Sequence, residues 1–100
     1  MALIRITRFT ADPADADTVL ERRRNLLDAI RSAFGAPTET RLIRVDERTW
    51  VDMWRWDSPE TLRAALDGAP RLPEAAAAFA VARDVTAEQG DVVDEDVWGR

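Results

Sequence analysis

The chain has 100 residues, a formal net charge of −5, and a hydrophobic fraction of 46% beside a charged fraction of 33%. These values are typical of one globular domain that spans residues 1–100. The acidic balance argues against nucleic acid as a partner, and no apolar run approaches the roughly 20 residues of a membrane span. We therefore expect a cytoplasmic protein that binds neither nucleic acid nor a membrane.

Cysteine, histidine, tyrosine and lysine are all absent, so all 14 basic residues are arginines. This composition excludes disulfides, thiolate nucleophiles, Schiff bases and histidine-based triads. It also excludes thiolate or imidazole metal sites, and the His, Cys and Tyr ligands that usually hold a haem. We expect no metal and no cofactor. Any chemistry must come from carboxylates, guanidinium groups, hydroxyls, amides and the four tryptophans.

The first half of the chain predicts a strand, a long helix and a hairpin. Residues 2–10 alternate between apolar and polar side chains, as a half-buried strand does. Asp12, followed by proline, is typical of a helix start and Gly35 of a helix end, with apolar residues at helical spacing between them. Two further alternating runs, 39–46 and 49–56, are separated by a tight polar turn, which indicates a β-hairpin.

The second half predicts two helices and a C-terminal strand. Ser58-Pro59 is typical of a helix cap and first turn, and Gly68 ends this helix. An alanine-rich helix is predicted over residues 74–83, and the tail over residues 84–98 is predicted to form one bent strand or two short ones. The order β-α-β-β-α-α-β favours an α+β fold of the ferredoxin-like βαββαβ type, with an antiparallel sheet and helices on one face.

The strand predicted over residues 49–56 is unusually rich in tryptophan. Its alternation places four side chains on one side, which we call the tryptophan face: Trp50, Asp52, Trp54 and Trp56. Val51 and Met53 fall on the other side, and we expect that side to pack under the helices. The tryptophan face would then point away from the helices, and it is too apolar to lie in water. We therefore predict a homodimer in which a second copy covers this face.

The tryptophan face has two interpretations, which are compatible with each other. In the functional one, the indoles of Trp50, Trp54 and Trp56 form an apolar pocket for an aromatic small molecule. Asp52 then orients or deprotonates a phenol or enol. In the structural one, the same side chains pack a dimer interface, and Asp52 forms a salt bridge with an arginine.

Arginines on the neighbouring strands are candidate partners of this carboxylate. If the aliphatic residues on the strand of Arg44 are buried under the helices, Arg44 points to the tryptophan face and can pair with Asp52. A one-residue change in the hairpin turn would bring Arg41 there instead. Asp52 and Arg44 are thus the predicted catalytic pair, with Arg44 or Arg5 stabilising a developing oxyanion. Phe9 shares the face of Arg5 and completes the predicted substrate-binding set with it and the tryptophans.

The run Arg22-Arg23-Arg24 in the long helix has the appearance of a basic cluster. Successive helical residues point about 100° apart, so the three side chains splay around the helix. Acidic residues on the same helix supply counter-charges. We expect ordinary surface ion pairs here.

The segment 50–66, WVDMWRWDSPETLRAAL, joins an aromatic strand to a Ser-Pro-Glu helix, and residues 90–95 read GDVVDE. The first segment resembles the antibiotic biosynthesis monooxygenase family, and the second resembles members of the wider dimeric α/β-barrel superfamily. The resemblance implies a homodimer in which two sheets close a barrel, with a pocket between sheet and helices in each subunit. It also implies oxygenation of aromatic polyketides, such as anthrones, without metal or flavin, because the deprotonated substrate itself reduces dioxygen.

Three hypotheses follow for the function. The leading one is a cofactor-independent monooxygenase of secondary metabolism that acts on an aromatic polyketide or phenolic substrate. The second is a polyketide cyclase or isomerase that uses the same pocket without oxygen, so dioxygen consumption separates the two. The third is a non-catalytic dimeric ligand-binding or structural module. A carboxylate fully neutralised by arginine, in a pocket closed to solvent, would favour the third.

Overall fold

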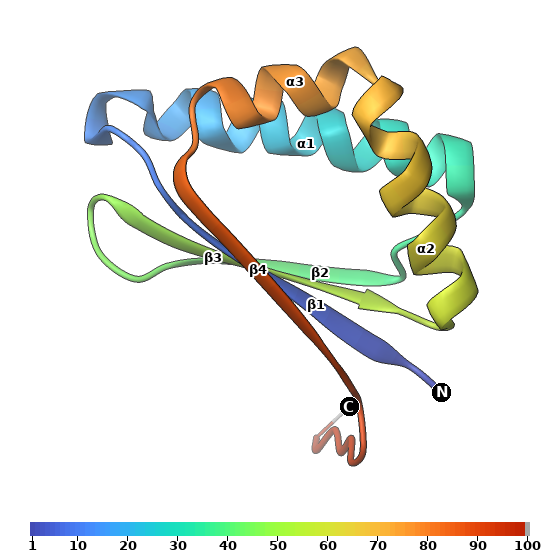
Figure 1. Ribbon diagram of the computed structural model, residues 1–100. Coiled ribbons are helices and arrows are strands. Elements are labelled where there is room, and N and C mark those ends of the chain that lie inside the picture. The colour runs from blue at the N-terminus through green and yellow to red at the C-terminus, as the bar shows by residue number, and fades with distance from the viewer. Residues whose placement is uncertain (100) are drawn as a thin grey trace.

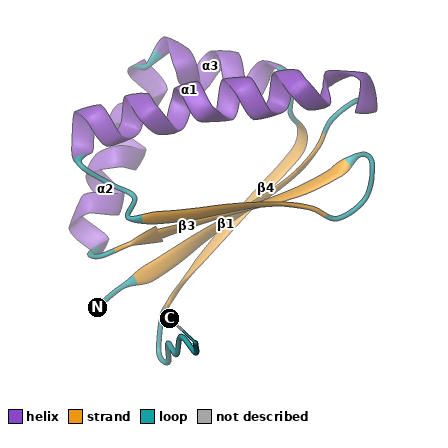
Figure 2. Cartoon of the chain, turned by 180° about the vertical axis from the view of Figure 1, so that it is seen from behind, coloured by secondary structure: helices purple, strands orange, loops and turns teal. Residues whose placement is uncertain are grey.

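A four-stranded antiparallel sheet in the order β2-β3-β1-β4 carries the helices on one of its faces (Figure 1). The computed structural model describes residues 1–99, and its elements in chain order are β1 (Leu3–Thr10), the 3-10 helix η1 (Pro13–Asp15), α1 (Ala16–Phe34), β2 (Glu39–Arg44), β3 (Thr49–Trp56), α2 (Pro59–Gly68), the 3-10 helix η2 (Ala69–Arg71), α3 (Pro73–Ala80) and β4 (Arg83–Asp91). Figure 2 shows the same two layers from behind. The arrangement confirms the predicted ferredoxin-like α+β fold. No helix among the described residues is long and apolar enough to cross a membrane.

Short sequence signals start and end the helices. The Asp12 carboxylate accepts a hydrogen bond from the Ala14 backbone N–H at 2.9 Å and starts η1, which leads into α1. Gly35 ends α1 with a φ of 71°, in the left-handed conformation that residues with a side chain rarely adopt. At α2, the Ser58 hydroxyl accepts a hydrogen bond from the Thr61 backbone N–H at 3.2 Å. The helix starts and ends predicted from these residues are confirmed.

The C-terminal part differs from the prediction in where its elements end. α3 ends at Ala80 rather than at Arg83, because Arg83 already pairs with Thr10 of β1 at the start of β4. β4 is one strand that ends at Asp91, and residues 92–99 continue without regular structure. Backbone hydrogen bonds of the β1–β4 ladder thus replace the last turn of the predicted helix.

The tryptophan face lies against the helices, so the predicted orientation of β3 was wrong. Trp56 is 2% exposed and packs in a cluster with Ile30 of α1 and Leu62 of α2. Trp50 is 4% exposed and packs in a second cluster with Val19 of α1. Both ends of β3 therefore contribute to the core between sheet and helices, and a second copy of the chain is not needed to cover the indoles.

Side-chain size explains this orientation. An indole removes more apolar surface from water than a valine or methionine side chain does. β1 adds Leu3 and Phe9 to the same face, directly opposite two of the tryptophans. Burial of this face under the helices therefore removes the larger apolar area from water. Val51 and Met53, which we expected under the helices, lie half-buried on the opposite side of the sheet.

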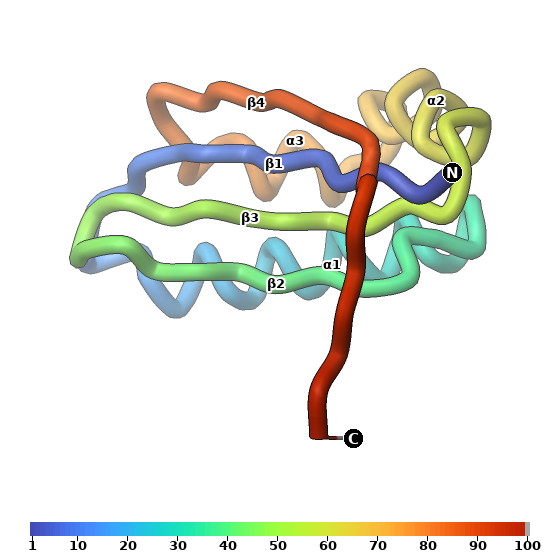
Figure 3. The backbone as a smooth tube through the Cα atoms, turned by 90° about the horizontal axis from the view of Figure 1, so that it is seen from below, coloured from blue at the N-terminus to red at the C-terminus, as the bar shows by residue number. Residues whose placement is uncertain are grey.

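We call that opposite side the open face, because none of the helices covers it. Residues 92–99 leave β4 and run across the strands on this side (Figure 3). The segment starts with a hydrogen bond from the Val92 backbone N–H to the Ala2 carbonyl at 2.9 Å. β4 itself is exposed along its whole length.

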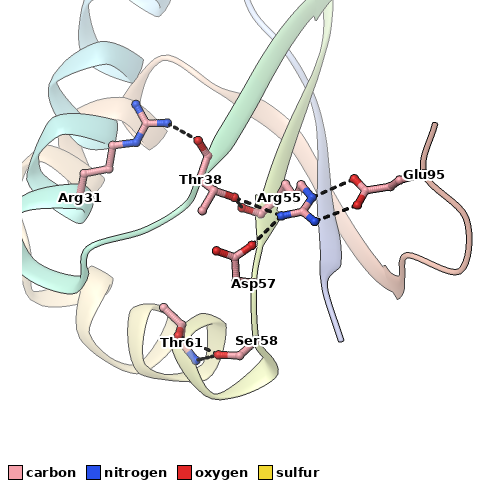
Figure 4. A network of polar contacts seen from close by, with 7 residues as sticks. All are labelled: Arg31, Thr38, Arg55, Asp57, Ser58, Thr61 and Glu95. Atoms are coloured by element: carbon pink, nitrogen blue, oxygen red, sulfur yellow. Dashed lines mark hydrogen bonds and ion pairs between the residues drawn. The ribbon is translucent and has the colours of Figure 1, made fainter. Parts of the chain in front are cut away.

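An ion-pair network on β3 holds this C-terminal segment (Figure 4). The Arg55 guanidinium donates from Nε and Nη2 to the two carboxylate oxygens of Glu95, at 2.9 and 2.8 Å. Its Nη1 donates to the Asp57 carboxylate at 2.6 Å. The hydrogen bonds from Arg55 hold the pKa of the Glu95 carboxyl below its ordinary value.

We predict that acid releases the C-terminal segment. A carboxyl whose pKa is lowered on folding stabilises the folded form above its ordinary pKa, and this stabilisation is lost as pH falls through the lowered value. The Val92 amide should therefore lose protection against hydrogen exchange as the pH is taken below 4.5, the ordinary pKa of Glu95. NMR hydrogen exchange, corrected for the intrinsic pH dependence, measures this.

In the variant Glu95→Gln, the Val92 amide should already be less protected against hydrogen exchange near neutral pH than it is in the unmodified protein. The matched control is Asp94→Asn, which removes the same charge from the adjacent residue, because Asp94 forms no ion pair among residues 1–99. Equal Val92 protection in Glu95→Gln and the unmodified protein would contradict the role of the Arg55–Glu95 pair.

Candidate functional site

A cavity of about 520 Å³ lies between the sheet and the helices. Its floor is formed by Trp54 and Trp56 and by the same side of β1, and its walls come from α1, α2, α3 and the start of β4. The lining is mostly apolar, and it includes four polar side chains: Arg5, Thr7, Arg23 and Asp52. A large apolar cavity with a few fixed polar groups is the usual form of a small-molecule site.

An ion pair between α1 and β3 is the main polar feature of the cavity. Arg23 donates from Nε to Oδ2 of Asp52 and from Nη2 to Oδ1, both at 2.9 Å. The two side chains are only 15% and 11% exposed. Apolar surroundings strengthen such a pair and penalise either charge alone. The pair therefore fixes the carboxylate in the cavity wall.

Asp52 pairs with an arginine, as the structural interpretation predicted, but the partner is Arg23 and not Arg44. In the hairpin register Leu42 lies opposite Asp52, while Arg44 lies opposite Trp50. Arg44 is on the predicted side of the sheet, yet its guanidinium stacks on the Trp50 ring at 4.8 Å. It does not line the cavity.

The sequence pattern indicated surface ion pairs for Arg22, Arg23 and Arg24, and this was wrong for Arg23. The signal that identifies it is its spacing. Arg23 lies at i+4 from Val19 and at i−4 from Leu27, and both of these neighbours are buried. It therefore shares the face of α1 that packs on the sheet. An arginine within an apolar helical stripe indicates a carboxylate in the layer beneath it.

Two of the three tryptophans predicted to contact a ligand line the cavity. Trp54 and Trp56 do so, with ring centroids 6.3 Å apart and ring planes tilted by 31°. The indole N–H of Trp56 is buried and has no acceptor among residues 1–99. Trp50 stacks on Phe9 within the core and does not line the cavity, whereas Phe9 does.

Arg5 lines the cavity beside Trp54, its partner in the β1–β3 ladder. Its Nη1 donates to the side-chain oxygen of Gln89 on β4 at 2.9 Å. Arg41, the alternative candidate on β2, lies opposite Met53 and so faces the open side of the sheet. Arg5 is therefore the predicted arginine that the fold brings to the cavity, together with the unpredicted Arg23.

The cavity lies on the helix side of the sheet, which overturns one expectation and agrees with another. The alternation of β3 led us to expect a pocket facing away from the helices, and this was wrong because the indoles themselves form the core. The family resemblance implied a pocket between sheet and helices, where the cavity is found. Among the described residues, no group of three or more His, Cys, Asp or Glu side chains is placed to hold a metal ion.

Neither a family model nor a curated protein matches the sequence. Solved structures match the fold over nearly the whole chain. SnoaB, a cofactor-independent oxygenase from Streptomyces nogalater, has a TM-score of 0.63 and 22% identity, over 99% of this chain and 98% of its own. A protein of Caulobacter crescentus, proposed to be an antibiotic biosynthesis monooxygenase, has a TM-score of 0.71 and 16% identity, over 93% and 91%.

A third match is described as a dimeric ferredoxin-like protein and comes from an uncultured marine organism. Its TM-score is 0.73 at 12% identity, over 98% of this chain and 93% of its own. At these identities the likeness is one of fold. It confirms at that level the resemblance suggested by the aromatic strand and the Ser-Pro-Glu helix: the chain has the ferredoxin-like fold of antibiotic biosynthesis monooxygenase structures.

Proposed function

We propose that this protein binds an aromatic polyketide or another phenolic small molecule in the cavity and oxygenates it without a metal or flavin. The observation that carries the proposal is the Arg23–Asp52 pair in the wall of an apolar cavity, with the indoles of Trp54 and Trp56 on the same floor. The cavity volume of about 520 Å³ suits a small-molecule ligand. A cofactor-independent oxygenase with the same fold supports the reaction class.

Asp52 is the group that accepts the proton of the substrate. Each carboxylate oxygen keeps a lone pair beyond its bond to Arg23 and can accept a hydrogen bond from a phenol or enol. Proton transfer to Asp52 leaves a substrate anion beside the Arg23 guanidinium, which stabilises the negative charge. In this role Arg23 replaces Arg44, the residue we predicted from the sequence.

The remaining steps balance without an added reductant. The substrate anion gives one electron to dioxygen, and the substrate radical and superoxide combine at carbon to form a hydroperoxide after protonation. In an anthrone, the hydroperoxide loses water and leaves a carbonyl group. One oxygen atom enters the product and the other leaves as water, so the substrate supplies all the electrons. The protein then contributes positioning and proton transfer.

One observation favours a second candidate, a non-catalytic ligand-binding module. Both oxygens of Asp52 already accept hydrogen bonds from Arg23, so the carboxylate is neutralised by its neighbour. The cavity nevertheless reaches the protein surface, because two of its lining residues, Phe79 and Leu66, are 54% and 42% exposed. A ligand can enter in either case, and turnover separates the two candidates. A cyclase or isomerase in the same cavity would convert its ligand without consuming dioxygen.

We also propose a homodimer, formed through the open face rather than through the tryptophan face. Apolar side chains that no helix covers, on this face and on the C-terminal segment that runs across it, include Ile4, Ile6, Val51, Met53, Val97 and Trp98. A second copy placed sheet to sheet would remove this area from water. The family resemblance implies such a barrel of two sheets, and one protein of the same fold is described as dimeric.

We predict that the purified protein consumes one dioxygen for each anthraquinone formed from anthrone. An oxygen electrode and chromatographic quantification of the product measure the two quantities. Trp54→Ala should lower kcat/KM by roughly tenfold, because an aromatic contact worth about 1–1.5 kcal/mol is lost. Trp50→Phe is the matched control: Trp50 is buried outside the cavity, so kcat/KM should stay within about twofold.

Each other outcome of this assay has a definite reading. Binding of anthrone without oxygen uptake would support the ligand-binding module. Conversion without oxygen uptake would support a cyclase or isomerase. Absence of both binding and turnover would refute the aromatic ligand.

We predict that Asp52→Asn lowers the free energy of unfolding by about 3 kcal/mol, because it leaves the Arg23 guanidinium without its counter-ion in a mostly buried site. Urea melts measure the change. Arg24→Met is the matched control, since Arg24 pairs with Asp28 at 3.9 Å on the exposed side of the helix and should cost less than about 0.5 kcal/mol. The double variant Arg23→Met/Asp52→Leu should recover most of the loss. The single variants Arg23→Met and Asp52→Leu complete the comparison, and a double variant that loses as much stability as these two together would contradict the coupling.

We predict that sedimentation equilibrium at micromolar concentration gives about twice the chain mass of 11.2 kDa. Met53→Arg places a charge on the open face and should shift the protein to the monomer. Leu20→Arg is the matched control, because Leu20 is exposed on α1, away from the open face, and the variant should remain dimeric. A monomer mass for the unmodified protein would refute the dimer.

A further inference from the structure

The cavity carries a net positive charge although the chain as a whole is acidic. Its charged lining residues are Arg5, Arg23 and Asp52, two cations and one anion, so their sum is +1. The whole chain has a net charge of −5. Arg23 and Asp52 neutralise each other at 2.9 Å. Arg5 is therefore the unbalanced charge of the cavity.

Arg5 keeps one complete hydrogen-bonding edge of its guanidinium unused. Its Nη1 donates to Gln89, an uncharged amide, while its Nε and Nη2 donate to no group among residues 1–99. Nε and Nη2 are the same two nitrogens that bind carboxylates elsewhere in this chain, in the pairs Arg23–Asp52 and Arg55–Glu95. This edge matches the spacing of the two oxygens of a carboxylate.

Arg5 lies on β1 near Asp52, the proposed proton acceptor on β3. Thr7 follows Arg5 on the same side of β1 and lies directly opposite Asp52 in the β1–β3 ladder. Two residues along a strand span about 7 Å. Substituents on one fused-ring molecule can bridge that distance. A ligand whose hydroxyl lies at Asp52 can therefore place a second group at Arg5.

We propose that the ligand of this cavity carries a carboxylate group, which the Nε–Nη2 edge of Arg5 binds. The proposal rests on the aromatic ligand of the proposed function, and it adds the substituent by which the site selects among aromatic molecules. An unpaired guanidinium edge attracts an anion, and one carboxylate makes the charge of the lining neutral. A phosphate monoester, with a charge near −2, would instead leave an unbalanced negative charge.

Isothermal titration calorimetry with two matched ligands tests this. Anthracene-2-carboxylate and anthracene-2-carboxamide share a ring system and nearly the same size, and they differ in charge. The unmodified protein should bind the carboxylate at least about tenfold more tightly at low ionic strength, because a bidentate charged pair replaces a neutral contact. Added salt should reduce the difference.

Two variants remove the preference by different routes. Arg5→Gln deletes the cation and should bring the two dissociation constants within about twofold of each other. Gln89→Glu leaves Arg5 in place but supplies a carboxylate from the exposed strand β4, and it should have the same effect. Arg8→Gln is the matched control: it deletes an arginine from the opposite side of β1 and should keep the preference.

The outcomes distinguish this proposal from the proposed function. Equal binding of both ligands by the unmodified protein would overturn the carboxylate and leave the aromatic cavity standing. Binding of neither ligand would refute the aromatic cavity and the carboxylate with it. A preference that survives both Arg5→Gln and Gln89→Glu would place the selective group elsewhere and would also overturn the proposal.

Discussion

The interior of this protein is organised by one constraint: β3 cannot bury its tryptophans without also burying Asp52. Strand alternation places these side chains on one face, and the area of the indoles directs that face to the helices. A carboxylate carried into the core in this way needs a cation within hydrogen-bonding distance. α1 supplies it as Arg23, from a position in its apolar stripe. The helix layer is thereby fixed to the sheet by charge as well as by packing.

The same constraint accounts for the polar and apolar character of the cavity. The ion pair is the main polar feature of a lining that is mostly hydrocarbon. The space beside it exists because α3 contributes small side chains, Ala75, Ala76 and Ala78, where larger ones would close the gap. The alanine run, which has little hydrophobic area of its own, thus sets the volume left open for a ligand.

Local signals in the sequence were sufficient to predict the helices and strands. They were not sufficient to predict which face of each strand meets the helices. Asp12, Gly35 and Ser58 act within one helical turn, so the helix starts and ends follow from neighbouring residues. Alternation separates the two faces of β3 but does not show which one meets the helices. That choice depends on the apolar area that β1 and the helices bury together with β3. The placement of Arg44 shows the same limit. Its side of the sheet was predictable from the hairpin, whereas its distance from Asp52 depended on a register that only the folded chain defines.

β4 leaves a long backbone edge unpaired, because it forms one border of the sheet and is exposed throughout. Such an edge is a template on which another extended chain can add, and natural proteins protect it with charge. Here the protection is mainly acidic: Asp84, Glu88 and Asp91 lie along the strand, against the single cation Arg83. Two such edges brought together would repel each other at neutral pH. The acidity of the chain therefore acts as a safeguard against edge-to-edge polymerisation.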